Sequence, residues 1–489
     1  MLIPRLYQAL NMESDAAPNR YAILAVVLAG VFMAVLDGVV VSIALPTITA
    51  HFGVDLDGTQ WVITAYLLTM TVLLLPMGRI SEYTGRAPLF VAGLVLFTLG
   101  SAACGLAPSL PFLIGSRVVQ AIGGAMVFSL SNALIFEAFP VTERGRALGY
   151  LGSVVAIGSL ASPVVGGGLV EVFGWESIFF INLPIGATVI AAALRVLPRA
   201  HVRPDRFTFD LPGALALGTA LAGLIFFLGR LAASPALDAT AVAYAFVAVA
   251  ATTAFVLVER RATAPLVDLG LFAEPLYVLP VLAMFLYFVA AFMLNLVGPF
   301  YFETVMGFSP GTVGLVFLLL PAIMAVTAPV SGWLYDRGRF PYLAAAGMGL
   351  VAAGYAVAGY AAQARLLVPM LGAFLVIGLG AGLFQAPNNT AQMSAVPRRW
   401  LGLASAITAS GRNLGMSLGV SIGSVLLSAL LVAGGSDGPI LEADPALLAS
   451  SVGAIIWTGA VLTAISAGLA TVRGVRAARA LREKEPVQP

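Results

Sequence analysis

The chain has 489 residues, of which 60% are hydrophobic and only 10% are charged. A soluble protein of this length carries about 25% charged residues, so the composition excludes an ordinary soluble domain. Runs of roughly 18 or more apolar residues recur along the whole chain, which is the pattern of transmembrane helices. The net charge is +2, and the single cysteine, Cys104, cannot form an intramolecular disulfide.

The apolar runs predict fourteen membrane spans. In chain order these are 22–46, 60–78, 87–107, 112–137, 147–170, 178–197, 211–230, 239–258, 276–301, 312–333, 342–361, 366–386, 402–433 and 449–472. An even number of spans places both termini on one side of the membrane. Most of the 25 Lys and Arg residues lie in loops and tails on that side, so the positive-inside rule places both termini in the cytoplasm.

Two similar cytoplasmic segments divide the chain into repeats. GRISEYTGRAPLF begins at Gly78 and GWLYDRGRFP begins at Gly332, and both have an acidic residue four positions after the glycine. The echo predicts an all-α polytopic membrane protein with two six-helix bundles around a midplane site, which is a transporter architecture. The expected parts are a cytoplasmic N-terminus (1–21), a bundle (22–197), a linker with two additional helices (198–275; about 211–230 and 239–258), a second bundle (276–472) and a basic cytoplasmic tail (473–489).

Asp37 and Arg117 are charges inside predicted spans. An ionised side chain in hydrocarbon is costly, so such residues face a protein interior and pair with one another. At 1.5 Å per residue, Asp37 lies about 22 Å from the cytoplasmic face and Arg117 about 8 Å from the opposite face. In a core about 30 Å thick these are the same level. The pair is either a structural salt bridge or a switch, in which Arg117 keeps Asp37 ionised until a proton or a cationic substrate displaces it.

Five segments carry a resemblance to a known family. They read LDGVVVSIALPTI, WVITAYLLTMTVLLLPMGRISEYTGR, RVVQAIGGA, SPVVGGGLVEVFGWESIFFINLPIG and FETVMGFSPGTVGLVFLLLPA. In this order they resemble the major facilitator superfamily, and more closely its fourteen-helix drug:proton antiporters of the EmrB and QacA type. The resemblance covers nearly the whole chain and is densest in the first six spans. It implies alternating access driven by a proton gradient.

The resemblance assigns a cytoplasmic latch loop that holds the two halves together when the cavity opens outward. Its residues are Gly78, Glu82, Gly85 and Arg86, with Asp336 and Arg337 in the second repeat. Glu82 stands where the family usually has Asp, and Ala87 where a basic residue is common, so the latch is expected to be weaker or reshaped. Arg86 can pair with Glu82 or with acids of neighbouring loops. A basic loop that only sets the topology is the alternative interpretation.

The fifth span carries an antiporter helix motif. Its residues are Gly158, Ser162, Pro163, Gly166 and Gly167. Small residues every four positions leave a smooth face on which another helix can approach closely, and Pro163 bends the helix locally. The resemblance implies that this face packs the two halves together on the outer side, with Ser162 replacing the usual glycine. A plain packing motif is an equally good physical description.

Further polar residues inside spans are candidates for the substrate cavity or, alternatively, for interhelical packing. These are Tyr66, Gln120, Gln385, Asn388, Asn389, Arg412 and Asn413. Arg412 has no obvious acidic partner in the membrane. Glu303, at the outer end of the ninth span, is a solvated residue at the mouth of the cavity or a second proton-coupling carboxylate.

The expected function is proton-coupled export of a lipophilic or cationic small molecule, with Asp37, Arg117 and Glu303 as proton-coupling candidates. Alternatives are a specific metabolite, antibiotic or siderophore transporter, or a passive channel or lipid scramblase. No phosphate-binding loop, metal-ligand spacing or catalytic triad is present in the sequence, so we expect no cofactor, no metal and no enzymatic activity. The expected partners are the substrate, protons and the lipid bilayer of a bacterial inner membrane, without nucleic acid, and the protein is expected to act as a monomer.

Overall fold

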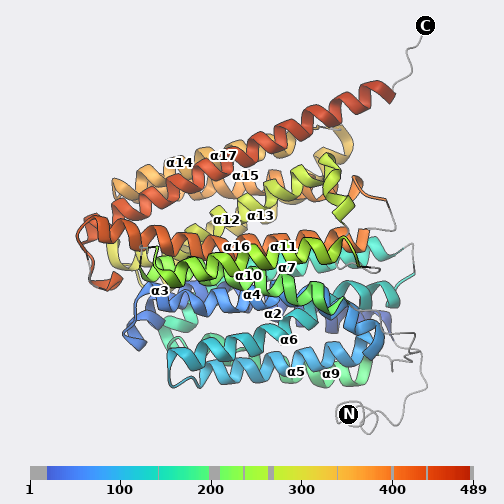
Figure 1. Ribbon diagram of the computed structural model, residues 1–489, viewed down its shortest axis with the longest axis horizontal. Coiled ribbons are helices and arrows are strands. Elements are labelled where there is room, and N and C mark those ends of the chain that lie inside the picture. The colour runs from blue at the N-terminus through green and yellow to red at the C-terminus, as the bar shows by residue number, and fades with distance from the viewer. Residues whose placement is uncertain are drawn as a thin grey trace.

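The computed structural model describes residues 19–140, 143–197, 210–234, 237–262, 269–338, 340–397, 401–436 and 439–484. Every regular element in these ranges is a helix, and the long helices run side by side along the long axis of the molecule (Figure 1). Thirteen of these helices are long and apolar enough to cross a membrane. Helix α4 (Trp61–Thr84), with 24 residues, lies among them and brings the set to fourteen.

Six long helices form the first group. They are α2 (Arg20–Phe52), α4, α5 (Arg86–Gly105), α6 (Leu110–Ala138), α7 (Arg144–Phe173) and the pair α8–α9 (Ser177–Phe180 and Asn182–Val196), with the short α3 (Leu56–Thr59) before α4. Helix α2 begins at the N-cap Asn19 and continues through Pro46 to Gly53, whose φ of +60° ends it. We call the end of the bundle at which α2 begins the terminal end.

The rest of the chain forms a helical pair and a second group of six. The pair is α10 (Leu211–Ala233) and α11 (Ala239–Glu259). After the 3-10 turn η1 (Leu269–Ala273) come α12 (Pro275–Phe300), its π-helical extension η2 (Tyr301–Val305), α13 (Pro310–Gly338), α14 (Leu343–Gln363), α15 (Leu367–Ser394), α16 (Leu401–Ala433), the 3-10 turn η4 (Ile440–Glu442) and α17 (Pro445–Lys484). Helix α17 continues well beyond the predicted span, because the segment VRAARALREK is rich in strong helix formers and contains no proline.

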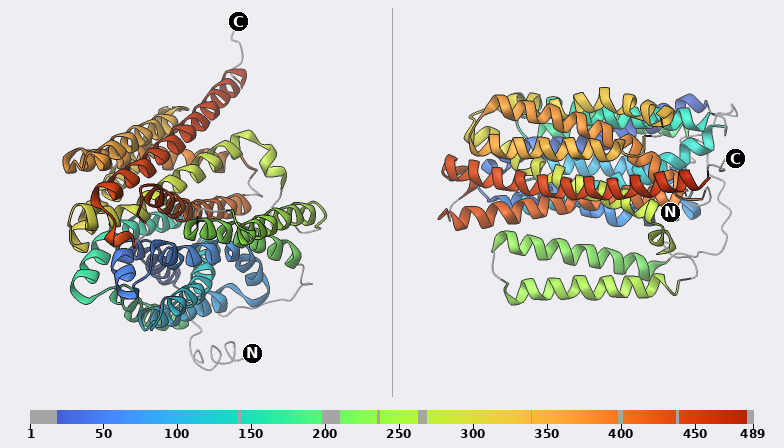
Figure 2. Two further views of the ribbon diagram at one scale, coloured as in Figure 1. Left: turned by 60° about the vertical axis from the view of Figure 1, so that its left-hand side comes forward. Right: turned by 90° about the horizontal axis from the view of Figure 1, so that it is seen from above.

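The packing of these helices places α2 among its neighbours in the first group. Its side chains from Ile23 to Thr49 are mostly buried, and it packs on α7, α6 and α9. The two groups of six touch each other chiefly through α7 against α13 and α4 against α16. The α10–α11 pair lies to one side, with α10 against α16 and α4 (Figure 2). Contacts between the groups therefore run mainly through α4 and α7 on the first side, with smaller contacts of α2 on α12 and α13.

Candidate functional site

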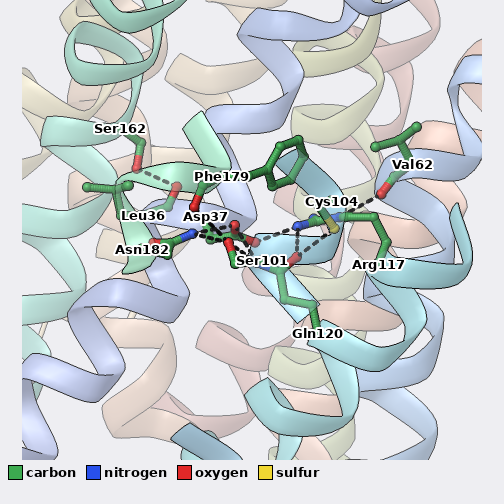
Figure 3. A network of polar contacts seen from close by, with 10 residues as sticks. All are labelled: Leu36, Asp37, Val62, Ser101, Cys104, Arg117, Gln120, Ser162, Phe179 and Asn182. Carbon is green, nitrogen blue, oxygen red and sulfur yellow. Dashed lines mark hydrogen bonds and ion pairs between the residues drawn. The ribbon is translucent and has the colours of Figure 1, made fainter. Parts of the chain in front are cut away.

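Asp37 and Arg117 form a buried ion pair. The Arg117 Nη1 atom lies 2.6 Å from Asp37 Oδ2, and both side chains are 0% exposed. Asp37 comes from α2 and Arg117 from α6, which run in opposite directions, so the equal depth predicted from the helical rise brings them into contact (Figure 3). The predicted pairing of these two residues is confirmed.

The other oxygen of the Asp37 carboxylate, Oδ1, accepts two further hydrogen bonds. Gln120 Nε2 donates to Asp37 Oδ1 at 2.8 Å, and Asn182 Nδ2 donates to the same oxygen at 3.0 Å. Both amides also donate to the hydroxyl of Ser101, at 3.1 and 2.9 Å, and Ser101 donates to the Phe179 carbonyl. The carboxylate thus accepts hydrogen bonds from one cation and two amides, all contributed by the first group of helices (Figure 3).

Sequence reasoning missed Ser101 and Asn182 as members of this network. Counted at 1.5 Å per residue from Arg86, Ser101 lies about 22 Å into α5, and Asn182 lies about 8 Å beyond Ser177. These depths match those of Asp37 and Arg117. The same comparison of depths would have found both residues, since each is a polar side chain in an otherwise apolar stretch.

Arg117 also connects the ion pair to α4. Its Nε donates to the Val62 carbonyl at 3.0 Å, and its guanidinium carbon lies 4.1 Å from the centroid of the Tyr66 ring. Its Nη1 donates in addition to Gln120 Oε1 at 2.6 Å. Tyr66 and Gln120 were expected to line the substrate cavity. In this conformation both are buried beside Arg117, because an ion pair at this depth requires polar neighbours.

The small residues of the α7 motif serve two different contacts. Gly158 and Gly166 face Val35 and Val40 of α2, and Ser162 donates its hydroxyl to the Leu36 carbonyl at 3.2 Å. These residues therefore pack within the first group and not between the groups, contrary to what the resemblance implies for the stripe as a whole. The reason is geometric, since positions 158, 162 and 166 share one helix face.

Pro163 and Gly167 lie on another face of α7 and do contact the second group. A Cβ atom on Gly167 would collide with the Pro310 carbonyl, and one on Gly314 would collide with the Pro163 carbonyl. The backbones of α7 and α13 thus meet directly near the start of α13, at the end of the bundle opposite the terminal end.

Hydrogen bonds from the same end reinforce this closure. Glu171 Oε2 accepts from the backbone N–H of Gly311 at 2.9 Å and from the Ser309 hydroxyl at 3.2 Å. A second bridge joins the groups where Asp55 Oδ1 accepts from the backbone N–H of Ile440 at 3.0 Å. The two groups are therefore held together at the end opposite the terminal end.

The predicted latch loop lies at the terminal end, where α4 passes into α5. Gly85 adopts φ +89°, and a Cβ on Gly78 would lie 3.6 Å from the Ser129 hydroxyl oxygen. Arg86 pairs with Glu137 of α6 at 2.5 Å, so its partner is an acid of the same group. The side chains of Glu82, Asp336 and Arg337 lie outside the described part of the structure.

The polar residues predicted in the second group have different environments. Asn388 and Gln392 are buried and both donate to the Pro280 carbonyl, at 3.0 and 3.3 Å, which is interhelical packing. Gln385 is half-buried, with its amide 3.5 Å from Met324 Sδ. Asn389 is exposed and Asn413 is buried.

Two charged side chains of the second group lack an ionic partner among the described residues. Arg412 is partly exposed, and its Nε is buried without a hydrogen bond. Glu303 lies in the π-helical turn η2 and its Oε1 is buried without a hydrogen bond. Among the residues that the structure describes, no three His, Cys, Asp or Glu side chains gather as a metal site requires.

Comparison with known proteins places the chain in a family. The Major Facilitator Superfamily model matches residues 27–420. The riboflavin transporter RibZ of Clostridioides difficile (strain 630) is 31% identical over 82% of this chain and 86% of that protein. The multidrug resistance protein Stp of Mycobacterium tuberculosis (H37Rv) is 34% identical over 83% and 74%. The tetracenomycin C resistance and export protein of Streptomyces glaucescens is 32% identical over 83% and 75%.

A solved structure agrees with this assignment at the level of the fold. It is a bacterial homolog to the human lysosomal transporter Spinster, in an inward-facing and occupied conformation, with a TM-score of 0.67 at 16% identity over 94% of this chain and 97% of that one. The matched family and relatives are membrane transporters. Because the family model spans most of the chain, this multi-pass membrane protein belongs to the major facilitator superfamily.

Proposed function

We propose that the protein is a proton-coupled exporter of lipophilic small molecules, of the fourteen-helix drug:proton antiporter type. The observation that carries the proposal is the position of the Asp37–Arg117 pair. It is a fully buried ion pair in which Arg117 contacts α4 and Asp37 follows Leu36, whose carbonyl is bonded to α7. These two helices make the most extensive contacts of the first group with the second. A change of charge at this pair can therefore alter the packing of α4 and α7 on the second group.

One route runs through α4. Arg117 holds the Val62 carbonyl and the Tyr66 ring, and α4 packs on α16 of the second group. The other route runs through α7. The Leu36 carbonyl, next to Asp37, accepts from Ser162, and the adjacent Pro163 carbonyl touches α13 at Gly314. Protonation of Asp37 removes the counter-charge of Arg117, so the guanidinium has to find a new arrangement, and α2, α4 and α7 shift with it.

This mechanism replaces direct competition between proton and substrate. Asp37 is 0% exposed in the present conformation, so a substrate in a central cavity cannot touch its carboxylate. Exchange then results from alternating access, in which the protonated and ionised forms of the pair favour different packings of α4 on α16 and α7 on α13. In this proposal 22–197 and 276–472 are the two moving bundles, and 198–275 joins them through α10 and α11.

The relatives support an export function, since they include a multidrug resistance protein and a tetracenomycin C resistance and export protein. A transporter of one specific metabolite is the second candidate, because a riboflavin transporter matches over a similar share of the chain. We further propose an inner-membrane location with cytoplasmic termini, action as a monomer, and the proton gradient as the only energy source. Glu303 is a secondary candidate for proton coupling.

The test uses purified protein in proteoliposomes with an imposed pH gradient, preceded by a susceptibility panel in a strain without efflux pumps. We expect the wild-type protein to export lipophilic drugs only when protons flow inward, and Asp37→Asn to abolish this coupling. Asp238→Asn, which alters a partly exposed ion pair at the start of α11, is the matched control and should retain it. Proton-driven efflux by Asp37→Asn at the wild-type rate would rule the mechanism out, and flux that ignores the gradient would indicate a channel.

A further inference from the structure

Arg412 is a cation without a counter-ion inside a membrane-length helix. It lies in α16, within the stretch Ile407–Ala433 that is apolar and long enough to cross a membrane. Arg117, the arginine buried in the first group, is paired with Asp37 at 2.6 Å, and Arg230, in the last turn of α10, is paired with Asp238 at 2.6 Å. Among the described residues Arg412 has neither an ion pair nor a hydrogen bond. An uncompensated guanidinium at this depth is costly unless it serves a ligand.

The side chain of Arg412 reaches accessible space. Its Nε is buried and has no partner, whereas the residue as a whole is partly exposed, so the end of the guanidinium is the accessible part. A guanidinium offers five N–H donors and no acceptor. Among the described residues the position therefore presents a partly exposed, positively charged fork whose N–H donors have no hydrogen-bond acceptor.

The neighbours of Arg412 cannot neutralise it. Thr408 lies one turn earlier on the same side of α16, and its hydroxyl donates to Gln392 Oε1 at 2.7 Å. The Gln392 amide in turn donates to the Pro280 carbonyl at 3.3 Å. Gly411 faces Val281 of α12, so the adjacent helix face is filled by apolar packing. Ser410 Oγ, two residues earlier, is buried without a hydrogen bond, but a hydroxyl carries no charge that could neutralise the guanidinium. Among the described residues the missing anionic acceptor has to come from outside this cluster.

We propose that Arg412 is a subsite for an acidic group, such as a carboxylate, on a lipophilic substrate. A planar guanidinium binds a carboxylate through two parallel hydrogen bonds, which gives both charge and shape selection. The inference rests on the proposed transport function and specifies its substrate class. It replaces the cationic class expected from Asp37 alone, because Arg117 already neutralises that carboxylate and leaves it no free charge for a cation.

Equilibrium binding of two dyes with the same ring system tests the proposal. Purified protein in lipid-free detergent micelles is titrated against carboxyfluorescein, which is anionic, and rhodamine 123, which is cationic, with fluorescence anisotropy as the readout. We expect the wild-type protein to bind carboxyfluorescein about tenfold more tightly, as one charged hydrogen-bonded contact implies. Arg412→Gln should remove this preference, and Arg412→Lys should retain part of it.

Arg230→Gln is the matched control, because Arg230 is an arginine of α10 with its own carboxylate partner. It should leave the preference for the anionic dye unchanged. Failure of the wild-type protein to prefer carboxyfluorescein, or an equal loss of both dyes in Arg412→Gln, would overturn the proposal. Displacement of carboxyfluorescein by phosphatidylglycerol would also overturn it, since the site would then belong to a lipid headgroup.

The binding measurement involves no pH gradient, so it separates this inference from the transport mechanism. A protein that prefers the anionic dye through Arg412 but shows no proton-driven efflux would support the subsite and contradict the proposed function. Proton-driven efflux without the Arg412-dependent preference would support the proposed function and contradict the subsite.

Discussion

Removing one member of the buried ion pair should cost far more than removing both. In Arg117→Met the Asp37 carboxylate, which is 0% exposed, keeps only the amide donors of Gln120 and Asn182 at 2.8 and 3.0 Å. An uncompensated charge of this kind destabilises a protein by about 3–5 kcal/mol. We expect Arg117→Met to unfold at correspondingly lower denaturant concentration than the wild-type protein.

The double variant Asp37→Leu/Arg117→Met removes both charges together. The NH2 groups of Gln120 and Asn182 still have the Ser101 hydroxyl as acceptor, at 3.1 and 2.9 Å, so neither donor group is left without a partner. Neutral replacement of a whole buried pair is often without cost. We therefore expect the double variant to regain at least about 2 kcal/mol relative to Arg117→Met, which is a positive coupling energy in a double-mutant cycle.

The assay is unfolding in mixed micelles, followed by tryptophan fluorescence, with proton-driven efflux measured on the same preparations. Arg230→Met, in a partly exposed pair at the end of α10, is the control and should change stability little. The reasoning fails if Arg117→Met is as stable as the wild-type protein, or if the double variant is no more stable than Arg117→Met. A stable double variant without efflux identifies the pair as a switch. A stable double variant with full efflux identifies it as a structural salt bridge.

Two further predictions concern the contact between α7 and α13 and the hydrogen bond from Asn182 to Asp37. Gly167→Val should disrupt the contact between α7 and α13, because the valine side chain would collide with the Pro310 carbonyl. Gly168→Val is the control, since no atom lies within 4 Å of a Cβ at Gly168. With Ser309→Cys as the reporter, labelling by an impermeant maleimide should rise in Gly167→Val and not in Gly168→Val. Equal labelling of the two variants would contradict the contact. Asn182→Leu should lower stability by about 1–3 kcal/mol in the same unfolding assay, since Asp37 loses a donor, and an unchanged midpoint would remove Asn182 from the network.

The helical framework could be predicted from the sequence because the hydrophobic effect and backbone hydrogen bonding both operate locally along the chain. An apolar run of sufficient length has to form a helix in a membrane, since no water is present to satisfy its N–H and C=O groups. The ends were less predictable, because helices do not stop where hydropathy falls. Helix α15 passes through Pro387 and continues to Ser394, beyond the predicted end at 386, and α17 continues to Lys484.

The sequence by itself determined the depth of each charge in the membrane. A constant rise per residue converts position in a span into a level, and on that basis Asp37 and Arg117 were correctly expected to meet. Only the tertiary structure decided which sides of the helices face one another. That is why Gln120 and Asn182 proved to enclose Asp37 and why α7 divides its small residues between α2 and α13. It is also why Arg412 has no partner among the residues that the structure describes. The depth of a residue follows from its own helix alone, whereas the neighbour that its side chain faces depends on how all the helices pack.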